Sequence, residues 1–281
     1  MCRTITFPLF ILLALPTLTS AQKAPAEVAT NLPTGWIHAP SRVQNAALWE
    51  CAAYGGSWVA STDGGKIKIA KFNADAGKQL PIPPQLKLSK KMIGRRTVQE
   101  TSGGWLVGFD AGEFGGGLWW FSRDGSKTIE LLSDNVHAIY EIKKTILILT
   151  GLSHMNLNFG HMYKLNDNAD KPTVTSVVTL GGSPEASTAD TDGDNIVIAT
   201  PERVLRVDMD GKVAELYKSG EHLTYPTSIA VETNGFIYVA MRFFVLRLSP
   251  QQGSDYKAEW LMLEHCRVFR LDKYICGCNT R

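Results

Sequence analysis

The sequence predicts an all-β protein, specifically a β-propeller of four-stranded blades. One pattern of short apolar segments separated by polar or Gly-rich turns returns five times, and no convincing amphipathic helix follows residue 21. The central anchor residues of the five repeats are spaced by 48, 41, 50 and 40 residues. Antiparallel strands that repeat every 45 residues or so are typical of propeller blades, whose sheets pack around a central channel. The anchors are Trp58, Leu106, Leu147, Val197 and Ile237.

Each repeat contains four candidate strands. The first two read ALWECAAYGGSWVAS from Ala47, RTVQETSGGWLVGF from Arg96, HAIYEIKKTILILT from His137, STADTDGDNIVIAT from Ser187 and TSIAVETNGFIYVA from Thr227. The third strands are KIKIAKF from Lys66, LWWFS from Leu118, MYKL from Met162, VLRVD from Val204 and FVLRL from Phe244. The fourth are LKLS from Leu86, TIELL from Thr128, TVTSVVTL from Thr173, VAELY from Val213 and AEWLML from Ala258. Short runs rich in β-branched and aromatic residues, bounded by Gly, Asn, Asp and Pro, favour strands over helices.

The two ends of the chain supply further strands. CRVFRL from Cys266 and YICGC from Tyr274 resemble the first two strands of another blade, and the segment from Gly35 to Ala39 offers it an outer strand. An unclosed ring would leave apolar sheet faces in water. We therefore favour six blades closed by both termini, with five blades and a clasping tail as the alternative.

The N-terminus has the pattern of a secretory signal peptide. Arg3 precedes an apolar run from Phe7 to Leu18, and small residues follow as far as Ala21. The run is shorter than the roughly 20 residues that span a bilayer, and no later stretch reaches that length. We expect cleavage after Ala21, which leaves residues 22–281 as a single propeller domain. The mature chain is expected to be a soluble monomer in a periplasm or outside the cell.

Export places the cysteines in an oxidising compartment, where disulfides form. The four candidates, Cys51, Cys266, Cys276 and Cys278, allow three complete pairings, and the sequence does not choose among them. Cys276 and Cys278 are separated by one residue, which favours other partners for each. A bridge from Cys51 to the tail would reinforce the closure of the ring.

Composition and charge exclude several classes of protein. The chain has 281 residues, of which 44% are hydrophobic and 20% charged, and this composition is typical of a folded domain rather than a disordered one. Lys and Arg number 29 against 27 Asp and Glu, a net charge of +2. This small excess gives no support to a nucleic-acid partner.

One repeat carries a family resemblance. YPTSIAVETNGFIYVAMRFFVLRL, from Tyr225 to Leu248, resembles an NHL-type propeller repeat in Pro226, the run SIAVE, the turn TNG and the following IYVA. The resemblance covers this blade well and the other four loosely, and Met241 and Arg242 stand where Asp and Asn are usual. Related propellers include metal-dependent lactonases and many binding scaffolds. The resemblance therefore implies the fold and not a particular activity.

The order of strands in a blade predicts which loops share a face. Loops that join the second strand to the third lie on the same side as the loops that link successive blades; we call this side the loop-rich face. A ligand is expected where polar side chains converge there, over the mouth of the channel. The candidate ligand-binding residues are Asp110, Glu113, His154, Asn156, His161, His222, Tyr225 and Arg242, with Asn158 and Glu221 nearby.

Several of these residues allow a second interpretation. His154 and His161 are seven residues apart and could ligate a metal, although loop histidines are more often hydrogen-bonded or solvated. Asp110 and Glu113 could act as an acid and base pair, or could simply be solvated. Arg242 could hold an anion or stack on Phe243 or Phe244.

Two other motifs are more readily structural. DTDGD, from Asp190 to Asp194, lacks the Gly and carboxylate that an EF-hand needs at its sixth and twelfth positions, so an ordinary hairpin turn is favoured. Trp119 and Trp120 are consecutive in a strand, so both can be buried on opposite faces, with an exposed carbohydrate platform as the alternative.

Three functions are compatible with these patterns. The leading hypothesis is a non-catalytic exported propeller that binds a protein or a small molecule on its loop-rich face, without a cofactor. The rival is a lactonase-like hydrolase with calcium or zinc in the channel, and the third is an accessory protein that blocks or scaffolds a secreted partner. The sequence has no Gly-x-Ser-x-Gly, His-Glu-x-x-His or phosphate-loop motif to indicate a particular catalytic chemistry.

Overall fold

The computed structural model describes residues 32–52, 55–73, 81–168, 171–220, 222–253, 255–271 and 273–278. Contacts between Cα atoms group Pro33–Arg281 into one compact unit. The expected signal peptide and the domain boundary after residue 21 lie outside the described residues and stay predictions. Within the described residues no helix has the length and hydropathy needed to cross a bilayer.

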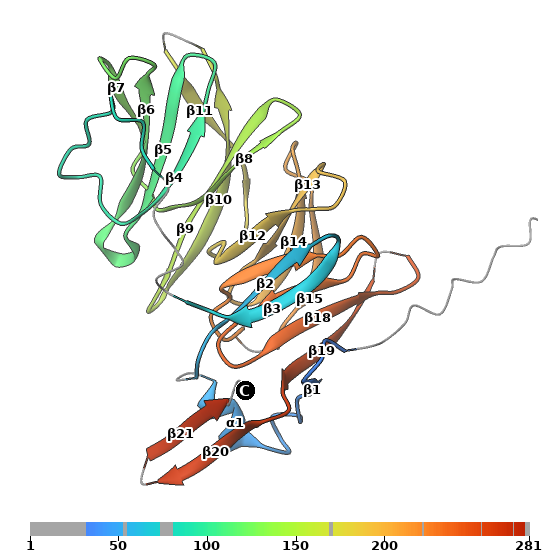
Figure 1. The fold of residues 1–281 in the computed structure, drawn as a ribbon. Helices are drawn as coiled ribbons and strands as arrows, with labels where there is room; N and C mark the ends of the chain where they lie inside the picture. The colour runs from blue at the N-terminus through green and yellow to red at the C-terminus, as the bar shows by residue number, and fades with distance from the viewer. Residues whose placement is uncertain are drawn as a thin grey trace, which may run out of the picture. The chain divides into compact units, whose positions relative to one another are not determined.

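Four antiparallel sheets make up most of the structure (Figure 1). The first contains β4 (Arg95–Glu100), β5 (Gly104–Asp110), β6 (Gly116–Ser122) and β7 (Thr128–Leu132). The second contains β8 (Val136–Ile142), β9 (Thr145–His154), β10 (Leu157–Asn166) and β11 (Thr173–Thr179). The third contains β12 (Ala186–Ala189), β13 (Asn195–Ala199), β14 (Arg203–Asp208) and β15 (Val213–Lys218). The fourth contains β16 (Ser228–Val231), β17 (Ile237–Ala240), β18 (Val245–Pro250) and β19 (Tyr256–Leu263).

Successive sheets pack against one another through corresponding strands. The first strands β4, β8, β12 and β16 contact each other in that order, and the outer strands β7 and β11, and β15 and β19, also meet. Central strands such as Asn195–Ala199 are apolar on both faces because a neighbouring sheet covers each face. This arrangement is a β-propeller of four-stranded blades, as predicted; the number of blades stays a prediction.

The first repeat differs from the other four. Its second and third strands form the hairpin β2 (Trp58–Asp63) and β3 (Lys66–Lys71), and β2 contacts β16. The strand expected from Ala47 is instead the helix α1 (Ala46–Cys51), so the prediction of no helix was wrong. Asn45 caps this helix by accepting a hydrogen bond from the backbone N–H of Leu48 at 3.1 Å.

The fourth strand expected at Leu86 in the first repeat is also absent. Residues 81–94 are turns and irregular segments in the structure. Pro81, Pro83 and Pro84 remove backbone donors that a sheet would need, and the N–H of Leu86 donates to the carbonyl of Pro83 in a turn at 3.0 Å. Leu86 is nevertheless buried, so its apolar character reflects packing and not strand pairing.

The two chain ends do not pair with each other. β1 (Trp36–His38) pairs with β19 as a fifth strand, with Trp36 opposite Leu263 and His38 opposite Leu261. β20 (Cys266–Leu271) and β21 (Lys273–Cys278) pair only with one another among the described residues, and both contact α1 (Figure 1). The prediction that the N-terminal strand completes a blade with the tail was therefore wrong.

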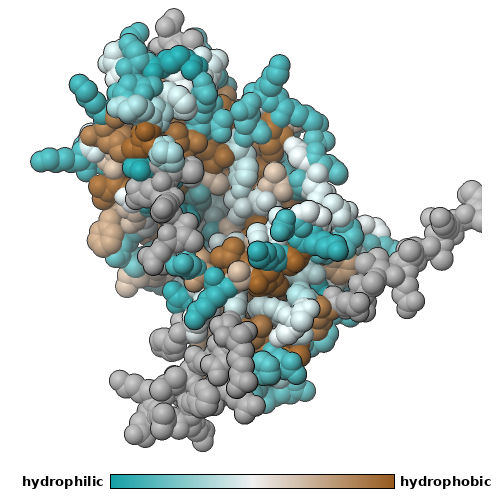
Figure 2. Space-filling model, viewed as in Figure 1, coloured by the Kyte–Doolittle hydropathy of each residue, from teal (hydrophilic) through white to brown (hydrophobic). Residues whose placement is uncertain are grey.

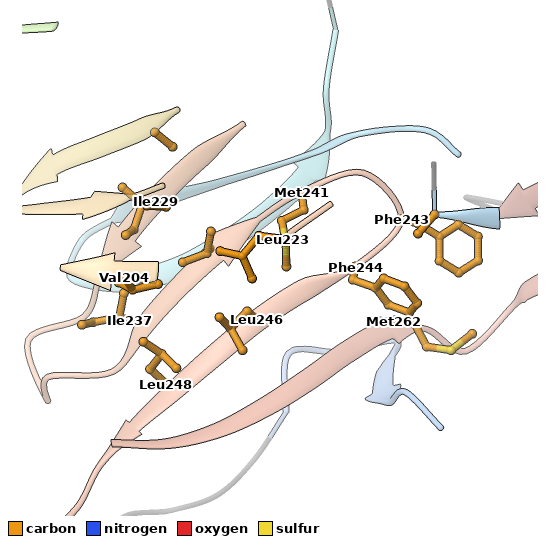
Figure 3. Close-up of a cluster of buried hydrophobic side chains, with 14 of the residues drawn as sticks. Val204, Leu223, Ile229, Ile237, Met241, Phe243, Phe244, Leu246, Leu248 and Met262 are labelled. Carbon is orange, nitrogen blue, oxygen red and sulfur yellow. The ribbon is translucent and has the colours of Figure 1, made fainter. Parts of the chain in front are cut away.

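Apolar side chains from neighbouring sheets form the core. In the largest cluster, Val204 of the third sheet lies beside Ile237 of the fourth, near Leu246 and Leu248 (Figure 3). Trp119 and Trp120 are both buried. The alternative that they form an exposed carbohydrate platform was wrong.

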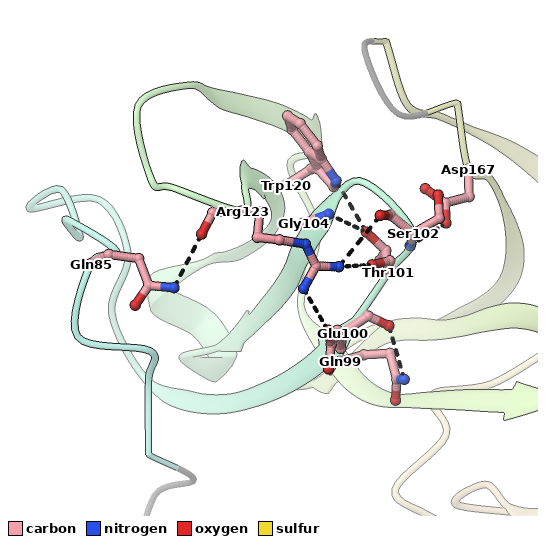
Figure 4. A network of polar contacts seen from close by, with 9 residues as sticks. All are labelled: Gln85, Gln99, Glu100, Thr101, Ser102, Gly104, Trp120, Arg123 and Asp167. Carbon is pink, nitrogen blue, oxygen red and sulfur yellow. Dashed lines mark hydrogen bonds and ion pairs between the residues drawn. The ribbon is translucent and has the colours of Figure 1, made fainter.

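Polar contacts fix the turns opposite the loop-rich face. Arg123 donates to Glu100 at 2.7 Å and to the carbonyl of Thr101 at 3.1 Å. The hydroxyl of Thr101 accepts from Trp120 Nε1 at 3.3 Å and from the N–H of Gly104 at 3.1 Å (Figure 4). The network satisfies the indole N–H of a buried tryptophan.

The DTDGD segment forms the turn between β12 and β13, as predicted. The Asp190 carboxylate accepts hydrogen bonds from the backbone of Asp194 at 3.1 Å and of Asn195 at 3.3 Å. The side-chain amide of Asn195 donates to the same carboxylate at 2.7 Å. Asp190 therefore serves the hairpin itself.

Candidate functional site

The first strands of successive sheets line a pocket of about 190 Å³, which we call the channel-mouth pocket. Apart from Tyr140 in β8, its lining residues occupy the starts of these strands or the links that precede them. Links of this kind were expected on the loop-rich face. The residues are Arg95 of β4, His137, Ala138 and Tyr140 of β8, Pro184 and Glu185, Ala186 and Ser187 of β12, Thr227, and Ser228 and Ile229 of β16.

His137 is held in one orientation at the wall of the pocket. Its Nε2 lies 3.1 Å from the carbonyl oxygen of Gly151 and 3.2 Å from the hydroxyl of Ser183. A carbonyl oxygen only accepts, so Nε2 carries a proton. The other ring nitrogen, Nδ1, is buried without a hydrogen bond and lies 3.8 Å from Asp110 Oδ2.

Asp110 lies close to both His137 and the cationic side chain of Arg95. Its Oδ2 accepts a hydrogen bond from Arg95 Nη2 at 3.1 Å, and its Oδ1 accepts from the N–H of Gly112 at 3.1 Å. Arg95 and Asp110 face each other across β4 and β5. The Arg95 side chain remains 61% exposed, which leaves other N–H groups available to a ligand.

Ser183, His137 and Asp110 follow the order of a nucleophile, base and acid, but their geometry does not fit that chemistry. Ser183 is fully buried, so a substrate does not reach its hydroxyl. The Nε2 proton is directed at Gly151, and 3.8 Å is too long for a hydrogen bond between His137 and Asp110. We conclude that Ser183 and Gly151 position the imidazole.

Most hydroxyl groups of the pocket already have partners within the protein. Tyr140 donates to Ser187 at 2.9 Å, and burial raises the pKa of the Tyr140 phenol, an effect that this hydrogen bond only partly offsets. Ser228 accepts from the N–H of Ala60 at 2.8 Å, and Thr227 donates to the carbonyl of Ala240 at 3.0 Å.

Glu185 differs from these residues. Within the described part of the chain, its half-buried carboxylate makes no hydrogen bond or ion pair. The pocket therefore presents one guanidinium, Arg95, and one uncompensated carboxylate, Glu185. These two groups lie on either side of β8, because β8 contacts both β4 and β12.

Two predicted site residues, Glu113 and His154, form an ion pair with each other. Glu113, in the 3₁₀ turn η2 (Gly112–Phe114), lies 2.8 Å from Nε2 of His154 at the end of β9. The loop predicted around His154 is instead a hairpin, because β9 runs to His154, β10 starts at Leu157 and only Met155 and Asn156 form the tip. Asn156 is exposed there.

Tyr225 and Arg242 form a second predicted pair. The guanidinium of Arg242 lies 3.9 Å from the centroid of the Tyr225 ring, and that ring is more than half exposed. Stacking on Phe243 or Phe244 was one of the two interpretations of Arg242, and an anion site was the other. Both of those rings are fully buried, and the guanidinium stays at the surface with the tyrosine instead.

His161 and His222 lie apart from the pocket lining. His161 is on β10, with its ring centroid 6.0 Å from those of Phe159 and Tyr163, and its Nδ1 is buried without a partner. His222 is exposed, with Nδ1 3.8 Å from Glu202 Oε1. The structure thus divides the eight predicted residues among several places; of these, Asp110 contacts residues of the channel-mouth pocket.

The donors that the structure describes do not fit a zinc site of the kind that the hydrolase alternative would use. Zinc sites in proteins use three or four side-chain ligands. Across the described ranges there is no cluster of three His, Cys, Asp or Glu that could hold a metal ion. At the pocket, the carboxylate of Asp110 is instead paired with the cation of Arg95.

The sequence analysis missed Arg95, His137 and Glu185. They lie at the starts of first strands or directly before them, whereas the predicted site residues come from connecting loops. A usable signal was present, since the repeat aligns His137 and Ser187 at the start of corresponding strands. The starts of innermost strands surround the channel in any propeller.

Comparison with known proteins adds two distant likenesses in structure. Neither a protein-family model nor a curated protein matches the sequence. Virginiamycin B lyase from Staphylococcus aureus is similar at 15% identity and a TM-score of 0.37, over 73% of this chain and 69% of that one. A gluconolactonase from Xanthomonas campestris is similar at 10% identity and a TM-score of 0.39, over 69% of this chain and 64% of that one. Because these scores are low, the propeller assignment rests on the strand pairing described above.

Proposed function

We propose that this protein is an exported, non-catalytic propeller that binds a small molecule in the channel-mouth pocket. The ligand carries a carboxylate, which pairs with Arg95, and a protonated amine, which pairs with Glu185. The observation that carries the proposal is the pocket itself: four successive first strands line one cavity, and its two charged lining groups have opposite signs. Ligand pockets typically combine apolar walls with a few fixed polar groups.

The arrangement supports binding more than chemistry. His137 is fixed by Gly151 and Ser183, and the nearest hydroxyl, that of Ser183, is fully buried. Arginine offers several donors to a carboxylate in a planar fork, and an uncompensated carboxylate favours a cation. A ligand with both charges therefore satisfies both groups at once.

The test uses 6-aminohexanoate as the probe, with hexanoate and hexylamine as single-charge comparisons. Calorimetric titration should show binding of 6-aminohexanoate, weakened about tenfold or more by Arg95→Gln or Glu185→Gln, because each removes a charge-assisted contact. Arg123→Gln is the matched control for arginine, since Arg123 is also exposed and paired with a carboxylate but lies at the opposite turns. Glu130→Gln, on the exposed surface of β7, is the control for Glu185.

Two results would contradict the proposal. One is the absence of measurable binding of all three probes to the intact domain. The other is equal affinity in the pocket variants and the control variants, which would place the probe elsewhere.

A protein partner on the loop-rich face is the second candidate. Phe114 and Met155 are 76% and 91% exposed, and the ion pair between Glu113 and His154 holds their two loops together. Figure 2 shows that apolar residues reach the surface over the part of the molecule that carries β4 to β7. Exposed apolar patches mark interaction sites. Capture from the native envelope should return a stoichiometric partner, and the double variant Phe114→Ser, Met155→Ser should lose it.

Export and cysteine pairing belong to the same proposal. Cys51 of α1 and Cys266 of β20 are both buried in the largest apolar cluster, and α1 contacts β20 and β21. We expect the purified exported protein to resist alkylation before reduction and to gain the mass of four labels afterwards. Full labelling without reductant would contradict export to an oxidising compartment.

A further inference from the structure

The hairpin of β2 and β3 has an open outer edge. In each of the four-stranded sheets the third strand pairs with a fourth on its outer side, as β6 does with β7 and β18 with β19. β3 is the third strand of the first repeat, and among the described residues it pairs only with β2 (Figure 1). The fourth sheet contacts the hairpin mainly through β2. The outer side of β3 therefore has no strand beside it in the described part of the chain.

The register of the hairpin determines which backbone groups point to this edge. The N–H of Phe72 donates to the carbonyl of Ser57 at 2.7 Å, and this register makes every second residue of β3 a hydrogen-bonded partner of β2. In an antiparallel pair the residues between these partners direct their N–H and C=O groups away from the neighbouring strand. In β3 these residues are Ile67, Ile69 and Lys71.

Most of the outward groups lack a hydrogen-bond partner. The N–H of Ile67 donates to Glu232 Oε1 at 3.1 Å, which holds this end of β3 against the turn after β16. For the N–H groups of Ile69 and Lys71, and for the carbonyls of all three residues, the described residues provide no partner. Unpaired backbone groups on a sheet edge form a template for another extended chain.

The side chains along this edge are cationic on one face and apolar on the other. Lys66 and Lys68 are exposed and share a face, whereas the half-buried Ile67 and Ile69 share the opposite face with the exposed Lys71. Within the described ranges none of the three lysines pairs with a carboxylate. Like charges oppose the pairing of two copies through this edge, whereas carboxylates on an added strand are attracted to it.

We propose that β3 binds an extended segment of a partner protein as an added antiparallel strand. This segment alternates acidic and apolar residues: its carboxylates lie opposite the three lysines, and its apolar side chains extend the face of Ile67 and Ile69. Its backbone pairs with the N–H and C=O groups of Ile69 and Lys71. The proposal is independent of the channel-mouth pocket, because no residue of β3 lines that pocket.

The probe is the capped peptide Glu-Thr-Val-Glu-Val-Glu, called here the acidic peptide. In antiparallel register its three glutamates lie opposite the three lysines, and its first valine lies opposite Ile69. Amide hydrogen exchange of the intact protein, measured by NMR, should slow about tenfold at Ile69 and Lys71 when the peptide is present at about ten times its Kd. The N–H groups of Lys68 and Ala70 already donate to β2, so their exchange should change little.

Two altered peptides separate strand addition from simple attraction of charge. Methylation of the first valine nitrogen removes the N–H that donates to the carbonyl of Ile69, and it should weaken binding about fivefold or more at unchanged charge. The capped peptide Lys-Thr-Val-Lys-Val-Lys keeps the backbone and the valines but reverses the charge. It should bind at least about tenfold more weakly than the acidic peptide.

Variants of the protein test the lysines. The triple variant Lys66→Gln, Lys68→Gln, Lys71→Gln should bind the acidic peptide about tenfold more weakly, because three exposed ion pairs are lost. Lys127→Gln, at an exposed lysine directly before β7, is the matched control and should bind it as the parent does. Thermal unfolding of each variant reports whether the fold is intact.

Several results would overturn the proposal. They are the absence of binding of the acidic peptide, equal affinity for the methylated or the basic peptide, equal affinity in the triple variant, and unchanged exchange at Ile69 and Lys71. Slow exchange of these two N–H groups before peptide is added would show that another part of this chain covers the edge. A dimer that the acidic peptide dissociates would assign the edge to a second copy, and either result would also overturn the proposal.

Discussion

Replacing Arg247 by Met should destabilise the domain because it leaves a partly buried carboxylate without its main partner. Arg247 and Glu259 are opposite each other on β18 and β19, and their side chains are only 3% and 14% exposed. Arg247 donates to Glu259 Oε2 from Nε at 3.0 Å and from Nη2 at 2.7 Å. The hydroxyl of Ser249 donates to the same oxygen at 3.1 Å.

The expected loss in free energy of unfolding depends on which partners Glu259 keeps after the substitution. Breaking a buried ion pair by removing one partner costs about 3 to 5 kcal/mol. Glu259 keeps its bond from Ser249, and Lys257 and His38 lie 3.7 Å and 4.0 Å from its Oε1. These partners, together with some solvent contact, favour the lower end, about 3 kcal/mol.

Urea unfolding at pH 7, followed by tryptophan fluorescence, measures this loss. Arg247→Met should lower the midpoint without changing the slope, and the double variant Arg247→Met, Glu259→Gln should regain most of the stability because the uncompensated charge is gone. Lys257→Gln, at an exposed position on the same carboxylate, should change stability by about 0.5 kcal/mol or less. A loss below about 1 kcal/mol for Arg247→Met at unchanged slope would refute the reasoning.

Two further predictions concern acid stability and close packing. Burial alone would raise the pKa of Glu259, but the hydrogen bond and charge of Arg247 outweigh it and the pKa is lowered. The ionised carboxylate therefore contributes its full share of stability above the unfolded pKa of about 4.3. This contribution is lost as the pH falls through the folded pKa. Between pH 6 and 3 the free energy of unfolding should fall less steeply for Glu259→Gln than for the parent protein. An identical pH dependence in the two proteins would contradict this. Gly160→Ala should cost about 1 to 3 kcal/mol, because an added Cβ would lie 2.2 Å from the carbonyl oxygen of Gly182. Thermal unfolding checks this, with Gly220→Ala as the control in open space.

Strands two to four of most repeats could be predicted because their signals are local. Alternating or fully apolar runs such as Ile237–Ala240, bounded by turn residues, specify a strand without knowledge of its neighbours. The helix at Ala46–Cys51 was missed because its six residues fall within a pattern that repetition had already assigned to a strand. Its signals, Asn45 as a cap and buried residues three apart at Leu48 and Cys51, are also local and were overlooked.

The candidate site was less predictable because it depends on packing between sheets. No pattern in the sequence indicated that Asp110 lies near His137, which is in the next sheet. The predicted stacking partner of Arg242 was wrong for the same reason. Neighbouring segments bury Phe243 and Phe244, which leaves Tyr225 as the accessible ring. Periodicity identifies strands, whereas which side chains meet depends on how the sheets twist and stack.

The channel-mouth pocket also depends on the hairpin formed by β2 and β3. This hairpin docks on the fourth sheet through side-chain and backbone hydrogen bonds. Ser228 accepts from the N–H of Ala60, the Thr227 hydroxyl contacts the carbonyl of Trp58, and the Nε1 and backbone N–H of Trp58 donate to the carbonyls of Phe243 and Met241, both at 3.1 Å. Thr227 and Ser228 are lining residues of the pocket, so the same hydroxyl groups that hold the hairpin also shape the cavity wall. Because their hydrogen bonds are used internally, the proposed function assigns ligand selection to the charged residues Arg95 and Glu185. These bonds hold the wall of the pocket at β16 in place, so the proposed recognition falls to Arg95 of β4 and to Glu185 directly before β12.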